Sequence, residues 1–504
     1  MRAPLIAVAG LSVLMLQVAC GPSARAGGGA ARLVASPAEL TAALHAVLAG
    51  DTIVVSDGTM DAGGDVEISL NGEPLRPIVI RAQRIGKTVL AGKTRLIFRN
   101  ASYITVQGFV FSGTRGPGAL LDGCRGVRLT RNTFELKESE KSSWVLIKGV
   151  SRSNRIDHSM FQHKHHLGNF ITIEGRKDSV VQVSQHDTID HNHFRDIGPR
   201  AENVLEAIRI GSSDYTLSSG YTLLEQNLFE RCDGDPEYVS IKSSDNTIRY
   251  NTFRECLGTL SLRHGNRNTV EGNFILGNRR SGLFTDSTGS SWVLGTGGIR
   301  FCGDSMVIVN NYMEGLTGRE WDAPLAVTNG DADYGEEKPL TKHYRIRDAV
   351  IAYNTLAENA SGLEIGYDGG GFQTNWWFYP PQGLTIANNL IVSNSDTAVR
   401  IFTAPLSSSW TGNIVFATGA GQVPPGTTGG VTVSDPKLVR KDGILRPGAG
   451  SPVRGAARAI AHHITRDMEG QLRKTPYDVG ADQLSDEKPL NHPLTARDVG
   501  PHAE

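Results

Sequence analysis

The chain has 504 residues, and 51 Lys and Arg residues balance 52 Asp and Glu residues, giving a formal net charge of -1. This balance excludes the strongly basic surface on which nucleic-acid-binding and polybasic membrane-binding proteins rely. Hydrophobic residues make up 39% of the chain and charged residues 20%, proportions that are typical of a globular protein and exclude a disordered one.

An export signal is predicted over residues 1–20. Residues 5–19 form an apolar run after a positive charge, and this run is shorter than the ~20 residues of a membrane span. Residues 17–20 end like a bacterial lipoprotein cleavage site, while ordinary cleavage after Ala26 is the alternative. We therefore expect export from a bacterial cell, either as a periplasmic or outer-membrane lipoprotein with a lipid on Cys20 or as a secreted protein.

Both ends of the remaining chain differ from its middle. Residues 37–49 carry Leu at helical spacing after Ser36, a favourable N-cap, so an N-terminal capping helix is expected there. A helix in this place would cover an open strand edge of the first turn. Residues 441–504 are predicted to pack along the body of the protein and to end in a polar tail, disordered from Ser485.

One short phrase recurs between these ends. It consists of an apolar pair, one or two polar residues, Asn, any residue and an aromatic or aliphatic residue, as in VRLTRNTF (127–134), TLLEQNLF (222–229) and NTIRYNTF (246–253). One closed turn of a β-helix consists of three strands of four or five residues, at ~3.3 Å per residue, and three bends. Such a turn contains about as many residues as lie between neighbouring copies of the pattern where these are most closely spaced. The sequence therefore predicts an all-β fold, a single-stranded right-handed parallel β-helix with loop insertions, over residues 33–440.

The recurring Asn is predicted to be structural. An inward-facing amide at a bend needs hydrogen-bond partners, and stacked copies in neighbouring turns can supply them. This interpretation assigns a hydrogen-bonded ladder, not catalysis, to Asn132, Asn192, Asn227, Asn251 and Asn354.

Charged residues gather at strand-like positions between residues 203 and 264. Lys242 and Arg263 are 21 residues apart, close to one turn of the repeat. We therefore expect both side chains to project from neighbouring strands on one face, because parallel strands lie ~4.8 Å apart. The same stretch contains Asn203, Arg209, Asp235, Glu237 and His264.

The run IKSSDNTIRYNTFRECLGTLSLRHG (241–265) resembles the core signature of polysaccharide lyase family 6, the family of alginate lyases and chondroitinase B. The resemblance is detailed over residues 200–275. It is weaker over most of residues 35–430, where it consists of the recurring sequence pattern. It implies a parallel β-helix enzyme that cleaves an acidic, uronate-containing polysaccharide by β-elimination. Alginate (polymannuronate and polyguluronate) is the expected polymer, with dermatan sulfate as the alternative.

The resemblance also implies roles for individual residues. A Lys base and an Arg acid match Lys242 and Arg263. One Ca²⁺ would be held by Asn203, Asp235 and Glu237, although this chain has Asp-Pro-Glu where the family commonly has Glu-x-Glu. Ca²⁺ accepts irregular sets of oxygen ligands, and a cation there would take up charge that spreads onto the substrate carboxylate as the proton leaves.

Four further residues are predicted to contact the anionic polymer: Arg209, His264, Lys164 and His165. The last two belong to the run HKHH (163–166), which could instead be a transition-metal site or a plain surface loop. Aromatic residues at 367, 376, 377 and 379 could stack on sugar rings or pack over the outside of the helix.

Two other classes of protein share this fold. A glycoside hydrolase would need two or three aspartates on adjacent turns, and Asp233 and Asp235 meet this need only in part. A non-catalytic polysaccharide-binding protein would not need Lys242 and Arg263 in register. In every case the expected partner is an acidic polysaccharide and not nucleic acid, with membrane contact only through the lipid on Cys20.

Overall fold

The computed structural model describes residues 29–201, 203–336, 338–370, 377–395, 397–417 and 429–503. The expected export signal, including Cys20, and Trp376 of the aromatic group lie outside these residues. No helix within them is long and apolar enough to cross a membrane.

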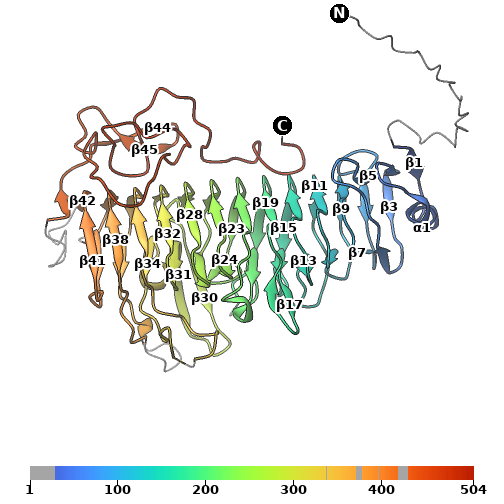
Figure 1. The fold of residues 1–504 in the computed structure, drawn as a ribbon, viewed down its shortest axis with the longest axis horizontal. Coiled ribbons are helices and arrows are strands. Elements are labelled where there is room, and N and C mark those ends of the chain that lie inside the picture. The colour runs from blue at the N-terminus through green and yellow to red at the C-terminus, as the bar shows by residue number, and fades with distance from the viewer. Residues whose placement is uncertain are drawn as a thin grey trace, which may run out of the picture.

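The described chain winds through three long parallel sheets that enclose one elongated core (Figure 1). This is the predicted parallel β-helix. The first sheet consists of β1 (Ala31–Val34), β2 (Thr52–Val55), β5 (Ile78–Ala82), β8 (Ile104–Gln107), β11 (Arg128–Thr130), β14 (Arg155–Asp157), β19 (Thr188–Asp190), β22 (Leu223–Glu225), β25 (Thr247–Arg249), β28 (Thr269–Glu271), β32 (Val307–Val309), β35 (Val350–Ala352), β38 (Leu384–Ala387) and β41 (Ser408–Thr411).

The second sheet carries the candidate site. Its parallel strands are β4 (Asp65–Ile68), β7 (Arg95–Arg99), β10 (Ala119–Asp122), β13 (Val145–Lys148), β16 (Ile171–Ile173), β21 (Ile208–Gly211), β24 (Glu237–Lys242), β27 (Gly258–His264), β31 (Ser291–Phe301), β34 (Leu325–Val327), β37 (Leu363–Ile365) and β40 (Val399–Ile401). One antiparallel strand, β30 (Ser281–Thr285), pairs with β31 outside this stack.

The third sheet closes each turn. It contains β3 (Gly58–Met60), β6 (Thr88–Leu90), β9 (Phe109–Phe111), β12 (Thr133–Phe134), β15 (Met160–Lys164), β20 (His193–Ile197), β23 (Leu228–Cys232), β26 (Thr252–Arg254), β29 (Phe274–Leu276), β33 (Tyr312–Glu314), β36 (Thr355–Asn359), β39 (Leu390–Ser393), β42 (Asn413–Ala417) and β43 (Val431–Val433). Short elements outside the three sheets are the hairpins β17 (Gly175–Lys177) with β18 (Val181–Val183) and β44 (Leu438–Lys441) with β45 (Ile444–Pro447), and the 3₁₀ turns η1 (Ser213–Tyr215) and η2 (Glu320–Asp322).

The recurring Asn forms the predicted ladder. The side-chain amide of Asn227 donates to Oδ1 of Asn251 at 3.0 Å, and Asn251 donates in turn to Oδ1 of Asn273 at 3.0 Å. Asn132 joins the ladder through Ser159, whose Oγ accepts from its main-chain N at 3.1 Å. The continuous part of the ladder comprises Asn192, Asn227, Asn251, Asn273, Asn311, Asn354, Asn389 and Asn413.

An aromatic stack accompanies the ladder inside the core. Ring centroids in consecutive turns are 4.3 to 5.0 Å apart along Phe111, Phe134, Phe161, Phe194, Phe229 and Phe253. Offset stacking at this spacing is favourable for aromatic pairs. Because like residues stack on like residues from turn to turn, the repeat in the sequence fixes the register of the strands.

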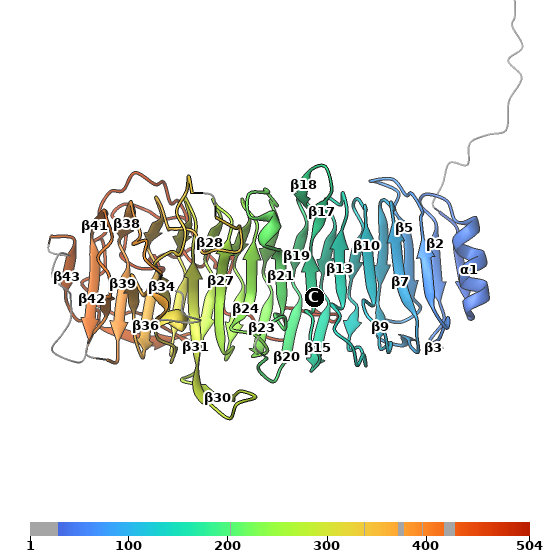
Figure 2. The same ribbon diagram turned by 90° about the horizontal axis from the view of Figure 1, so that it is seen from below.

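The capping helix is present as α1 (Pro37–Ala46) at the N-terminal end of the stack (Figure 2). Ser36 is its N-cap, and Oγ of Ser36 accepts from the main-chain N of Glu39 at 3.2 Å. The helix buries Leu40 and Leu44. It ends three residues before the predicted end at residue 49, because the backbone at Val47 is already extended.

The C-terminal segment, residues 429–503, returns along the outside of the stack (Figure 1). Near its end, Leu494 and Val499 pack against Leu228. The guanidinium of Arg131 donates to two main-chain carbonyls among the last residues, at 2.9 and 2.8 Å. The prediction of a disordered tail from Ser485 is therefore wrong. Although this segment is mostly polar, two buried apolar side chains and hydrogen bonds to its main chain fix it against the β-helix.

Candidate functional site

The candidate residues belong to β21, β24 and β27 and the segments next to them, and these three strands are neighbours in the second sheet (Figure 2). Arg209 on β21 pairs in register with Ser240 on β24. Ser240 pairs with Ser261 on β27, and Ser261 pairs with Arg300 on β31. These four residues form a row across the floor of the site. The predicted substrate ligand Arg209 is already ion-paired, since its Nη2 lies 3.0 Å from Oε1 of Glu174.

Lys242 and Arg263 come from neighbouring strands of this face. Lys242 ends β24, and a register shift after Ile241 pairs it with His264, so that Arg263 is the extra residue of a β-bulge. The Arg263 side chain keeps 26% of its surface exposed, whereas His264 is 4% exposed. The structure therefore brings the predicted base and acid to one wall, and the bulge turns the guanidinium toward solvent.

Glu237 is the centre of a charge network beneath these two residues. Its Oε1 lies 2.8 Å from Nη2 of Arg300 and 3.4 Å from Nε of Arg263, and the hydroxyl of Ser240 donates to its other oxygen. Burial alone would raise the pKa of Glu237. Positive charge on Arg263, Arg300 and Lys242 outweighs this effect and lowers the pKa to about 2. Glu237 is therefore an anion at neutral pH.

Asp235 and Glu206 complete an acidic cluster with Glu237. Oδ1 of Asp235 accepts from the main-chain N of Glu237 at 3.0 Å. Burial, together with the negative charges of Glu206 and Glu237, raises the pKa of Asp235 to about 7. Glu206 is 1% exposed, and its Oε2 has no hydrogen-bond partner among the described residues. Asp235 and Glu206 are therefore buried carboxyl groups within electrostatic reach of Glu237.

Asn203, the third predicted metal ligand, is not brought into this cluster. It lies exposed in the loop before β21, and no described contact links it to Asp235 or Glu237. Ile208 pairs with Val239, an offset of 31 residues, and the same offset places Glu206 beside Glu237. This offset is longer than one regular turn of the repeat, so Glu206 can be identified only when the register of β21 on β24 is known.

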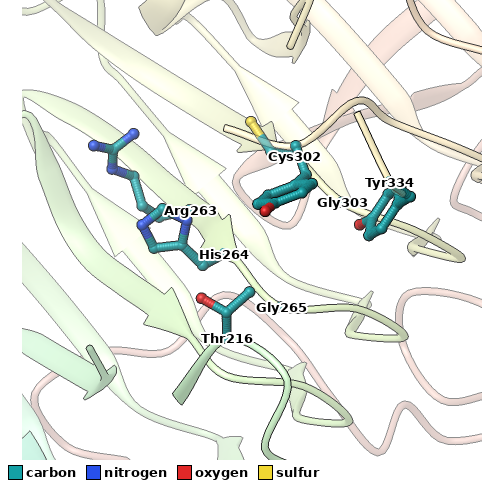
Figure 3. A pocket seen from close by; sticks show the side chains of 8 residues that line it. Thr216, Arg263, His264, Gly265, Cys302, Gly303 and Tyr334 are labelled. Carbon is teal, nitrogen blue, oxygen red and sulfur yellow. The ribbon is translucent and has the colours of Figure 1, made fainter. Parts of the chain in front are cut away.

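His264 lies beneath the surface of the site and is neutral. Its Nε2 is 3.3 Å from Oγ of Ser213. Burial, followed by the positive charges of Arg263 and Lys242, lowers the pKa of His264 to about 3. The side chain that was expected to contact the polymer is therefore buried and uncharged in the structure. Figure 3 shows the imidazole beside Arg263 in a small hollow that Tyr334 also lines.

Lys164 and His165 do not reach the second sheet, because they lie at and just beyond the end of β15 in the third sheet. The ammonium group of Lys164 is completely buried, ion-paired with Glu138 and 5.0 Å from the ring centroid of Trp144. Nδ1 of His165 donates to the main-chain carbonyl of Gly198 at 2.7 Å. The prediction of substrate contacts is wrong for Lys164, since a buried ion pair cannot meet a polymer, and the structure does not bring His165 to the site.

An aromatic wall stands beside Arg300. The Arg300 guanidinium lies 5.0 Å from the ring centroid of Trp321, and Trp377 is 4.4 Å from Trp321 and 4.1 Å from His343 between centroids. Burial and the charge of Arg263 hold the pKa of His343 far below its usual range. The aromatic residues were expected either to stack on sugar rings or to pack on the outside of the β-helix. Trp377 is 4% exposed, so it packs against the protein.

Arg300 and His343 belong to the site although their positions in the sequence do not indicate it. Arg300 follows Arg263 by 37 residues instead of about one turn, because the β30–β31 hairpin is inserted between them. His343 stands on a long connection between β34 and β35, outside the repeat. Insertions of this kind hide residues from an argument that depends on spacing.

Known proteins match this fold and this arrangement of strands. The family model for chondroitinase B matches residues 34–419. Among solved structures, the PL6 family alginate lyase AlyGC is 30% identical with a TM-score of 0.72, over 84% of this chain and 56% of that chain. A mannuronic acid specific polysaccharide family 6 lyase from human gut microbiota is 25% identical with a TM-score of 0.68, over 82% of this chain and 92% of that one.

A third solved structure, a PL6 alginate lyase in complex with a trisaccharide, is 25% identical with a TM-score of 0.66, over 84% of this chain and 92% of that one. This chain therefore spans somewhat more than half the length of AlyGC and nearly all of the other two. No curated protein matches it significantly. With a family model over most of its described β-helix, the chain belongs to the chondroitinase B family, which is polysaccharide lyase family 6.

Proposed function

We propose that this protein cleaves alginate by β-elimination and leaves an unsaturated uronate at the new chain end. The observation that carries this proposal is the position of Lys242 and Arg263 on neighbouring strands of one wall, with Glu237 buried between their charges. Alginate lyases among the similar structures favour alginate. The chondroitinase B family match makes dermatan sulfate the second substrate to test.

In the proposed reaction, the amine of Lys242 first releases its own proton to water and then takes the proton from the carbon that bears the uronate carboxylate. The electrons of that C–H bond form the carbon–carbon double bond as the bond to the glycosidic oxygen breaks. Arg263 stabilises the leaving oxygen, which takes its proton through water because a guanidinium is hard to deprotonate. Arg300 holds Glu237 and so fixes the charge beneath the reacting sugar.

We propose that a divalent cation binds at the acidic cluster, where Glu206, Asp235 and Glu237 would hold it. Two observations support this assignment: the buried Oε2 of Glu206 has no hydrogen-bond partner among the described residues, and the pKa of Asp235 is raised. A bound cation would give Oε2 a partner and would reduce the repulsion between the carboxylates. When bound, Ca²⁺ would neutralise the charge that spreads onto the substrate carboxylate. Calcium at this cluster is the proposal, with Glu206 in place of Asn203.

We expect Glu206→Gln to weaken Ca²⁺ binding by at least about tenfold, as measured by isothermal titration of EDTA-treated protein. The same change should raise the melting temperature without Ca²⁺, since it removes repulsion from a buried cluster. Glu174→Gln is the matched control, because Glu174 is partly exposed on the same face and pairs with Arg209. Equal Ca²⁺ affinities of the two variants would place the ion elsewhere.

The reaction is tested by incubating the purified protein with alginate, polymannuronate, polyguluronate and dermatan sulfate while following the ultraviolet absorbance of the new double bond. Absorbance is expected from alginate. Product from dermatan sulfate alone would reverse the choice of substrate. Saturated reducing ends would indicate a hydrolase, and the absence of product from all four polymers would indicate a binding protein.

A further inference from the structure

The β30–β31 hairpin projects from the body of the β-helix (Figure 2). Its two strands pair antiparallel through five residue pairs, from Ser281–Gly295 to Thr285–Ser291. The remainder of β31 enters the second sheet, where Arg300 pairs with Ser261 of β27. The projecting arm is therefore a direct continuation of a strand that forms the floor of the site.

The two faces of this arm carry different side chains. Phe284 and Trp292 are cross-strand partners whose ring centroids lie 5.9 Å apart with an interplanar angle of 22°. Leu283 and Val293 are the adjacent pair, and they point to the opposite face because side chains alternate along a strand. Trp292 is 49% exposed. The arm thus presents an aromatic platform on one side and an aliphatic pair on the other.

The platform lies on the side of the hairpin that faces the bend before β27. Gly282 lies on the same face of β30 as Phe284, two residues away. A Cβ at Gly282 would come within 2.5 Å of the Leu257 side chain, which directly precedes β27. The Phe284–Trp292 side of the hairpin is therefore turned toward the beginning of β27, the strand on which Arg263 stands.

The rest of the arm carries hydroxyl groups and almost no charge. Asp286 is its single charged residue between 281 and 295, and its carboxylate accepts hydrogen bonds from Thr288 and Ser290. Sugar rings stack their C–H faces on aromatic rings and bond to hydroxyl groups through their own hydroxyls. The hydroxyls available on the arm are those of Ser281, Thr285, Ser287, Thr288, Ser290 and Ser291.

The charges at the base of the arm argue against a membrane as its target. A membrane-binding surface sets Lys or Arg next to its apolar residues so that they can meet anionic lipid headgroups. Here the two nearest cations are engaged: Arg279 pairs with Glu358 at 2.8 Å, and Arg280 pairs with Asp233 at 2.6 Å. An aromatic, hydroxyl-rich arm whose one charged residue is an aspartate suits a carbohydrate better.

We propose that the β30–β31 hairpin is a polysaccharide-holding arm, on which Phe284 and Trp292 stack against a sugar of the same chain that occupies the site. This inference rests on the proposed function. Eight residues separate Trp292 from Arg300, which at ~3.3 Å per residue is roughly 26 Å along the strand. The arm therefore acts several sugars away from the reacting one and affects long polymers, while short oligosaccharides do not reach it.

The test compares Trp292→Leu with Leu283→Ala on alginate polymer and on an alginate tetrasaccharide. Leucine keeps an apolar side chain in the hairpin and removes only the ring, while Leu283 is equally part of the arm but lies on its other face. Trp292→Leu should raise the KM for polymer roughly 2- to 12-fold, the range of one aromatic contact, and should leave the tetrasaccharide unchanged. Trp292→Phe should restore the polymer KM.

Equal effects of Trp292→Leu on polymer and tetrasaccharide, or equal effects of Trp292→Leu and Leu283→Ala on polymer, would overturn the inference. A change of oligomeric state in either variant on size-exclusion chromatography would also overturn it, since the arm would then join two copies of the chain. If the unaltered protein releases no unsaturated product, the proposed function fails separately. In that case, binding of alginate by the arm is measured as retardation of the protein in native gels that contain alginate. The inference is supported only if Trp292→Leu reduces this retardation.

Discussion

Lys242→Ala is expected to lower the release of unsaturated product from alginate by roughly a hundredfold to ten-thousandfold, the contribution of a positioned general base. Lys242 stands at the end of β24 with its side chain partly exposed, so its truncation leaves the core intact. The melting temperature should therefore change little. Initial rates from the ultraviolet assay, together with thermal unfolding of both proteins, measure the two effects.

Two further variants separate the proton acceptor from its charge. Lys148→Ala is the matched control, because Lys148 ends β13 on the same sheet and lies 3.4 Å from Asp122, away from the site; its rate should equal that of the unaltered protein. Lys242→Arg keeps a positive charge but cannot act as a neutral base, so it should be as inactive as Lys242→Ala. Substantial activity in Lys242→Arg would show that charge suffices and would refute the role as base.

The second large effect is expected from Asn251→Ala, which should lower the free energy of unfolding by about 3–5 kcal/mol. The Asn251 side chain donates to the carbonyl of Leu224 at 2.9 Å and to Oδ1 of Asn273 at 3.0 Å, and it accepts from the main-chain N of Asn227 at 3.0 Å. Alanine leaves several of these buried groups without partners, at about 1–3 kcal/mol each. Urea-induced unfolding followed by circular dichroism measures the change.

Asn278→Ala serves as the control for the ladder. Asn278 is an exposed residue after β29, and its side chain donates to Oε1 of Glu255 at 2.7 Å on the surface. Its replacement should lower the free energy of unfolding by only about 1 kcal/mol, because the backbone at Asn278 has a φ of 49°, which alanine adopts less readily than asparagine. A loss in Asn251→Ala that is no larger than in Asn278→Ala would mean that the ladder follows from the fold and does not stabilise it.

Most of the fold could be predicted because each residue of the repeat has both a fixed place in a turn and a fixed environment, either in the core or at a bend. Asn251 and Phe253 mark a bend and the start of a core strand in one turn, and their counterparts do so in the others. The tail from Ser485 carries no such repeat. Its order depends on contacts with Leu228, more than 250 residues earlier, which no local pattern reveals.

The site was predictable only where the repeat is uninterrupted. Lys242 and Arg263 are one turn apart, and the structure brings them to one wall. Lys164 was misread because Glu138, the anion that buries it, lies 26 residues earlier in a segment without strand pattern. Arg300 is displaced by the hairpin, and Glu206 stands in a loop where the charged residues cannot be ranked until the register is known.

The ribosome makes residues 494–503 long after Arg131 and Leu228, with which they are in contact in the folded protein. Turns of the β-helix can stack in order as they emerge, yet Leu228 stays uncovered until Leu494 and Val499 have been added. Arg131 is made earlier than Leu228, and the carbonyls that it binds belong to Pro501 and Ala503. A nascent chain therefore exposes an apolar surface around Leu228 until residues 494–499 have been made.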